Sequence, residues 1–209
     1  GQLGAARAAR RDVAAALADR PTYPELFERA FGTPEVTSAR IAFAIATYER
    51  TLISDQTPYD AWLAGDNNAM TPTQVAGFNA FIGPNSACIA CHFTINHLFT
   101  DQEYHNLGVR PVEEDSGRFA VTQELDDRGR FRTPGLRNIG LRTRFMHDGS
   151  HAGLAEVVRF YAQSPGAPPQ FSDNLDPVMP AINITEEDQA AMVDFMQHAL
   201  TDPRVANET

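Results

Sequence analysis

The chain has 209 residues, of which 43% are hydrophobic and 21% charged, as is usual for a globular protein of one sizeable domain or two small ones. Its formal net charge of -10 disfavours nucleic acid and anionic membranes as partners, because both would repel it. The longest apolar stretch, Ile41 to Ala46, is too short to cross a bilayer, so no membrane span is expected.

The first part of the chain is helical by pattern. The Ala-rich run from Ala5 to Ala18 is a strong helix former. Thr22 can cap the segment YPELFERAF, which has a proline in its first turn and ends at Gly32. Thr37 or Ser38 begins another helix, because apolar residues recur after it at helical spacing, namely Ile41, Ile45, Tyr48 and Leu52.

A further helix is predicted to begin at Thr71, where Pro72 and Gln74 complete a capping-box pattern, and to end at Gly83 and Pro84. Its expected buried face consists of Val75, Phe78 and Ile82. Helices return at Gly153 to Ala162, where Leu154, Val157, Val158 and Tyr161 share a face, and after Thr185, with His198 in the last turn. Between them, the segment SPGAPPQF is expected to be a loop.

The segment from Phe93 to Ser150 has a different character. It holds neither a helical nor a strand period and is repeatedly interrupted by Gly, Pro, Asp and Arg. An irregular run of that length in a compact domain needs something other than secondary structure to organise it. A large bound cofactor would do so.

The two cysteines of the chain lie in the motif Cys88-Ile89-Ala90-Cys91-His92, which is C-x-x-C-H, the attachment pattern of c-type haem. One helical turn sets both thiols where each can form a thioether with a haem vinyl group, and His92 then ligates the iron. Zinc would need further ligands, and no other cysteine exists to supply them. A thioredoxin-type pair would need a parallel sheet. A disulfide or an idle pair is the structural alternative.

The second axial ligand decides what such a haem can do, because Met, Tyr or an empty site favour different redox states. The candidates after the motif are Met146, His147, His151, Tyr161, Met179, Met192 and Met196. Spacing favours Met146, while the helical period turns Tyr161 inward; either residue can instead be part of the core.

Haem propionates need cationic partners, and six arginines fall within seventeen residues at Arg128, Arg130, Arg132, Arg137, Arg142 and Arg144. We expect Arg132 and Arg137 to be the cationic partners of the propionates. The alternative is pairing with the nearby acids Glu113, Glu114, Asp115, Glu124, Asp126 and Asp127.

Several motifs together resemble the bacterial di-haem cytochrome c peroxidase and MauG family. The longest is FRTPGLRNIGLRTRFMHDGSHAGLAEVVRFY, from Phe131 to Tyr161; the others are AIATYERTLIS, YDAWLAGD, YHNLG and DSGRFAVT. The resemblance spans nearly the whole chain in order. It implies an all-α fold, with a cytochrome c-like haem domain wrapped by long irregular loops.

In this family the distal ligand of the second haem stands fourteen residues after the histidine of an H-x-G motif, and counting from His147 arrives at Tyr161. The resemblance to the MauG branch therefore implies a His92/Tyr161 haem. It also implies that His105 and His147 lie near this haem, although either can be an ordinary polar loop residue. A calcium ion in the family would here use the backbone carbonyls of Arg142 and Arg144, but the usual Thr and Pro are absent.

The family has two haem motifs and this sequence has one. The resemblance thus implies that residues 66–209 form the second haem domain, and that residues 1–65 are a helical segment leading to a first haem domain that is a separate chain, cleaved or absent. It implies a periplasmic oxidoreductase that uses hydrogen peroxide, relays oxidising equivalents, and meets a redox partner protein or small reductant. The alternative function is a monohaem electron-transfer cytochrome c with a His/Met haem.

Overall fold

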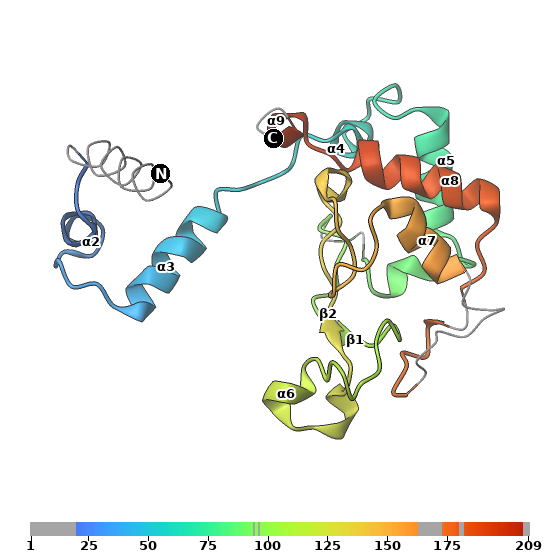
Figure 1. Cartoon of the computed structure of the whole chain (residues 1–209). Coiled ribbons are helices and arrows are strands. Elements are labelled where there is room, and N and C mark those ends of the chain that lie inside the picture. The colour runs from blue at the N-terminus through green and yellow to red at the C-terminus, as the bar shows by residue number, and fades with distance from the viewer. Residues whose placement is uncertain (1–19, 94, 96, 163–172, 180–181, 207–209) are drawn as a thin grey trace, which may run out of the picture. The chain divides into compact units, whose positions relative to one another are not determined.

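The computed structural model describes residues 20–93, 95, 97–162, 173–179 and 182–206. The chain divides into two compact units after Ile53 (Figure 1). The helix predicted from Ala5 to Ala18 and the loop predicted at SPGAPPQF lie outside the described residues. Within the described part, no helix has both the length and the apolar character needed to cross a membrane.

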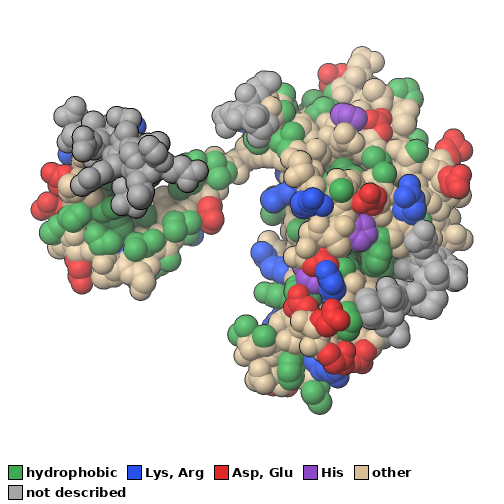
Figure 2. Space-filling view, in the orientation of Figure 1, with side chains coloured by type: hydrophobic (Ala, Val, Ile, Leu, Met, Phe, Trp, Pro, Cys, Tyr) green, Lys and Arg blue, Asp and Glu red, His purple; other side chains and the backbone are tan. Residues whose placement is uncertain are grey.

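The described part of the first unit contains two helices that begin where the sequence predicts. Helix α2 covers Tyr23–Phe31, with Thr22 and Glu25 forming a capping box and Gly32 ending it in the left-handed conformation, with φ 81°. Helix α3 covers Ser38–Glu49 and is capped by Thr37. No side chain of α3 is buried in the described structure. Figure 2 shows hydrophobic side chains on the surface of this unit, and Phe43 and Tyr48 are 63% and 65% exposed.

The second unit is built mainly from helices. Threonine caps begin α4 (Pro58–Leu63), α5 (Pro72–Ile82) and α8 (Glu186–Asp194). The others are α7 (Leu154–Ala162) and α9 (Pro203–Ala206). The predicted helix after Thr185 is confirmed, but its last part, Phe195–Ala199, widens into a π-helical turn, η5.

The core of the second unit lies where α5 crosses α8 (Figure 1). Gly77 allows this approach, because a Cβ at that position would collide with the backbone carbonyl of Ala191. On the same face of α5, Phe78 and Phe81 are buried. Of the predicted face, Phe78 is buried and Val75 packs partly buried against the core, whereas Ile82 is 37% exposed.

Helix α4 belongs to this core, since Tyr59 is 1% exposed and packs against Phe78, Phe99 and Phe195 at ring-centroid distances of 5.3, 5.3 and 5.9 Å. The compact unit therefore begins at Ser54, earlier than the boundary expected after residue 65. The YDAWLAGD motif, Tyr59 to Asp66, lies within the second unit.

The segment from Phe93 to Ser150 is irregular, as expected. Its regular elements are short: strands β1 (Tyr104–His105) and β2 (Phe131–Arg132), helix α6 (Phe119–Thr122) and the 3₁₀ turns η2 (Leu125–Asp127) and η3 (Ile139–Leu141). The strands pair antiparallel, with Tyr104 opposite Arg132. Helices are thus the main regular structure of the described chain, which contains little strand.

Candidate functional site

A cavity of about 430 Å³ lies in the second unit between helices and irregular segments. Helices α7 and α8 with Phe81 of α5 form one wall, and residues 105–110 and 129–147 form the other. Most of the lining is apolar. Seven residues predicted as site residues line this one cavity, namely Cys88, Cys91, His92, His105, Arg132, His147 and Tyr161.

Cys88 begins the 3₁₀ turn η1 (Cys88–Ala90), Cys91 follows as its C-cap, and both line the cavity. The amide of His92 donates to the carbonyl of Cys88 at 2.9 Å, which closes the turn. Both thiols are free of disulfides. Burial raises the pKa of Cys88 to about 11 and that of Cys91 to about 12. At neutral pH they are therefore protonated thiols, unlike the activated thiolates of redox or zinc sites.

The imidazole of His92 is held in one orientation. Its Nδ1 lies 2.7 Å from the carbonyl oxygen of Phe99, and because a carbonyl only accepts, Nδ1 carries the proton. The other nitrogen, Nε2, is left with its lone pair available to a metal. Burial lowers the pKa of His92, which keeps the ring neutral. The role of Phe99 could not be found from the sequence, because an irregular loop connects the two residues.

Tyr161 approaches the cavity from α7. The predicted inward face of this helix is confirmed, since Leu154, Val157, Val158 and Tyr161 all line the cavity. Burial raises the pKa of the Tyr161 phenol above its usual range. Among the described residues its hydroxyl has no hydrogen-bond partner, which disfavours the alternative of a core tyrosine that donates one hydrogen bond. Four methionines also line the cavity: Met146, Met179, Met192 and Met196.

His105 is fixed by two carboxylates. Its Nδ1 lies 2.6 Å from Asp176 and its Nε2 lies 2.9 Å from Asp101. Burial lowers the pKa of His105, but the hydrogen bonds and charges of Asp176 and Asp101 outweigh it and raise the pKa overall. Ligand atoms of Cys91, Asp101 and His105 lie within 4.8 Å of one another. A metal ion there would have to break these hydrogen bonds. The two carboxylates instead hold the His105 ring in place.

His147 stacks on Phe131 with ring centroids 3.6 Å apart and planes 8° apart. Burial lowers the pKa of His147, against the opposing effect of Asp115, whose carboxylate lies 3.4 Å from Nε2. Both rings line the cavity. Phe131 was not predicted from the sequence as a site residue, although it opens the longest family motif.

Arg137, which we expected from the sequence to pair with a haem propionate, is engaged elsewhere in the structure. Its guanidinium forms a bidentate pair with Asp60 at 2.8 and 2.7 Å and also donates to the carbonyls of Ser54 and His97. It does not line the cavity, because these bonds direct it to the start of the second unit. The expected pairing with nearby acids holds for Arg128, which lies 3.3 Å from Glu113.

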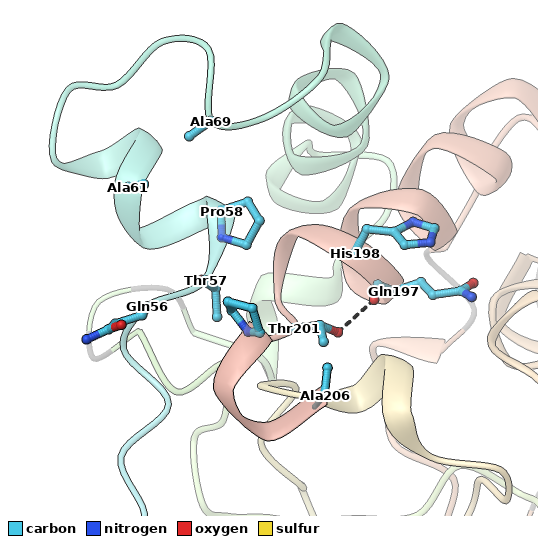
Figure 3. Close-up of a pocket in the computed structure, with 10 residues that line it drawn as sticks. Gln56, Thr57, Pro58, Ala61, Ala69, Gln197, His198, Thr201 and Ala206 are labelled. Carbon is cyan, nitrogen blue, oxygen red and sulfur yellow. Dashed lines mark hydrogen bonds between the residues drawn. The ribbon is translucent and has the colours of Figure 1, made fainter. Parts of the chain in front are cut away.

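A second hollow, of about 490 Å³, lies between α4 and the end of the chain (Figure 3). Ala61 and Ala69 stand on one side, and Gln197 and Thr201 on the other, with Thr201 donating to the carbonyl of Gln197 at 2.7 Å. It is open, and its described lining contains one titratable side chain, His198. It brings together none of the predicted site residues.

Comparison with known proteins gives consistent similarities. A family model described as di-haem cytochrome c peroxidase matches residues 4–68. Methylamine utilization protein MauG of Methylorubrum extorquens is 32% identical over 185 residues, which cover 88% of this chain and 50% of that protein. The cytochrome c551 peroxidase of Nitrosomonas europaea is 39% identical over 146 residues, which cover 68% of this chain and 42% of that protein.

Two solved structures are also similar. A MauG-like protein associated with microbial copper homeostasis has a TM-score of 0.68 and 27% identity, covering 84% of this chain and 60% of that chain. The di-haem peroxidase BthA from Burkholderia thailandensis has a TM-score of 0.59 and 25% identity, covering 74% of this chain and 48% of that chain. The chain spans about half the length of the curated relatives it matches.

Proposed function

The chain belongs to the di-haem cytochrome c peroxidase and MauG family, and on that premise we propose that it carries one covalent haem c of a di-haem oxidoreductase. The proposed enzyme uses hydrogen peroxide and relays oxidising equivalents through a haem held between His92 and Tyr161. We further propose that the second haem is held by an N-terminal haem domain or chain, and that the protein works in the periplasm.

One observation carries this proposal: the two thiols, the His92 imidazole and the Tyr161 phenol line the same apolar cavity, from η1 and from α7. The donor set suits haem c, because protonated free thiols are the groups that form thioethers and a neutral imidazole is an iron ligand. When bound, the haem supplies one-electron chemistry at its iron. The apolar part of the lining would limit the access of water to a haem held there.

Each residue has a distinct role in this arrangement. Phe99 fixes the tautomer of His92 through its carbonyl, which presents Nε2 to the cavity. Tyr161 presents a hydroxyl that no described side chain engages. As a phenolate ligand it would give up its proton, and a phenolate stabilises oxidised iron more than a methionine does. A tyrosine ligand therefore suits an iron that stores oxidising equivalents better than one that only transfers electrons.

The proposal is tested by the spectrum of the haem-loaded protein. Pyridine haemochrome absorbance should report one covalent haem c per chain. Tyr161→Phe should change the electron paramagnetic resonance signal and the visible spectrum, because a coordination position opens. Met146→Leu is the matched control and should leave both unchanged. An unchanged spectrum in Tyr161→Phe would remove the tyrosine ligand.

A monohaem electron-transfer cytochrome c remains the second candidate, since Met146 lines the same cavity. It predicts the opposite result: Met146→Leu alters the spectrum and Tyr161→Phe does not. Peroxide consumption separates the two functions further. The proposed enzyme should consume peroxide when the N-terminal haem domain is present and lose this activity in Tyr161→Phe, whereas the carrier should show no turnover.

A further inference from the structure

The charged side chains that line the cavity are all of one sign. Among the described residues these are Arg110, Arg132, Arg142 and Arg144, and no aspartate or glutamate lines the cavity. The chain as a whole has 27 acidic and 17 basic residues. An apolar cavity whose charged lining residues are all arginines is suited to an apolar ligand that carries negatively charged groups.

These arginines differ in how far their charge is already compensated. Arg110 Nε lies 2.7 Å from Asp148, so its charge is neutralised. Arg132 donates to the amide oxygen of Gln102 at 2.7 Å, which leaves its charge uncompensated. Within the described part of the chain, Arg142 and Arg144 have no side-chain hydrogen bond or ion pair.

Three arginines away from the cavity are paired with acids. Arg118, Arg128 and Arg137 each lie within 3.3 Å of a carboxylate oxygen, at Asp127, at Glu113 and Asp173, and at Asp60 respectively. Arg142 and Arg144, in contrast, line the cavity and have no acidic partner among the described residues.

Arg142 and Arg144 stand on a short segment whose two ends are held by backbone hydrogen bonds. Arg142 has extended backbone, with φ -85° and ψ 144°, and its amide donates to Ile139 at 3.1 Å, which ends η3. Arg142 and Arg144 both line the cavity. Phe145, the residue after Arg144, is fixed in place, because its amide donates to the carbonyl of His151 at 2.9 Å and its side chain is only 8% exposed. The pair is thus presented from a fixed segment.

We propose that Arg142 and Arg144 form a carboxylate clamp that holds the propionates of the haem bound in this cavity. This inference rests on the proposed function. Guanidinium and carboxylate match in geometry and can form paired hydrogen bonds, which are strong beside an apolar wall. The clamp takes the role that the sequence analysis gave to Arg137, and it makes both arginines positioning residues for the cofactor.

The clamp predicts a change in the reduction potential of the haem, which a purely structural role would not cause. Ferric iron has one more positive charge than ferrous iron, so a nearby arginine disfavours the ferric state. Arg142→Gln and Arg144→Gln should each lower the midpoint potential, by up to about 59 mV, a tenfold change in the one-electron equilibrium constant. The potential should also become more dependent on pH between 5 and 8, roughly where an unpaired buried propionate titrates.

Arg159→Gln is the matched control, because it removes the same charge from an exposed position on α7 outside the cavity. It should leave the potential and its pH dependence unchanged. Arg142→Lys and Arg144→Lys keep the charge and should recover most of the potential. If a glutamine variant does not fold, the Lys variants replace it in the comparison. Lysine cannot form the paired hydrogen bonds of arginine, so each Lys variant should hold the propionate less firmly. Altered propionate bands in the resonance Raman spectrum would report this.

The outcomes separate this inference from the proposed function. Wild-type protein without covalent haem would overturn the proposed function and the clamp with it. Haem-loaded Gln variants with the potential and pH dependence of Arg159→Gln would overturn the clamp alone. A fall in potential at Arg142 and Arg144 but not at Arg159 supports it.

Discussion

The two walls of the cavity are held together in different ways. The helical wall, made by α5, α7 and α8, rests on helix hydrogen bonds, threonine caps and close apolar packing around Gly77. The irregular wall, residues 93–150, rests on bonds from side chains, such as Thr100 to the carbonyl of Thr133 at 2.7 Å and Arg137 to Asp60. The first wall should therefore be sensitive to volume, and the second to charge and hydrogen bonding.

The largest effect is expected at Gly77, which tests the close packing of the helical wall. Gly77→Ala should lower the free energy of unfolding by about 3 kcal/mol, because its Cβ meets the backbone of Ala191, which cannot rotate away. This loss exceeds the gain of about 1 kcal/mol that alanine brings to a helix interior. Urea denaturation measures it. Gly153→Ala, with no atom within 4 Å of its Cβ, is the control. Equal stability of both variants would contradict the packing argument.

A smaller effect is expected where the irregular wall is tied to the start of the second unit. Arg137 and Asp60 side chains are 13% and 20% exposed. Arg137→Gln should cost about 2 kcal/mol, because it leaves the Asp60 carboxylate partly buried without its partner. Arg128→Gln removes the same charge, but its partners Glu113 and Asp173 are 72% and 57% exposed. It should therefore lower the free energy of unfolding by less than about 0.5 kcal/mol. Chemical denaturation of the two variants decides whether burial makes the difference.

The smallest effect, and the most specific, is the pH dependence of stability at His105. Its pKa is raised in the folded protein, so its contribution is fully present below the unfolded value of 6.5 and is lost as pH rises through the folded pKa. The difference in unfolding free energy between wild type and His105→Gln should therefore shrink from pH 6 to pH 9. Asp101→Asn should weaken this dependence, because one of the two carboxylates is gone. A difference independent of pH would mean that His105 contributes through packing alone.

The beginnings of four helices, two in each unit, could be predicted from the sequence. The caps at Thr22, Thr37, Thr71 and Thr185 are confirmed, since a cap is a local pattern of residues that bond to their own helix end. The inward face of α7 is confirmed for the same reason. The face of α5 was predicted only in part, because Gly77 and Phe81 are buried by contact with α8, and helical periodicity alone does not identify that partner.

The sequence by itself determined the local chemistry of this protein: two thiols and a histidine on one turn, a tyrosine on an apolar helix face, and a stretch rich in arginine. Only the tertiary structure decided which arginines reach the cavity, that Phe99 orients His92, and that two aspartates hold His105. The physical reason is that bonds between side chains distant in the chain depend on how an irregular segment folds back on itself. No residue spacing encodes that path, whereas a helix carries its geometry in its own period.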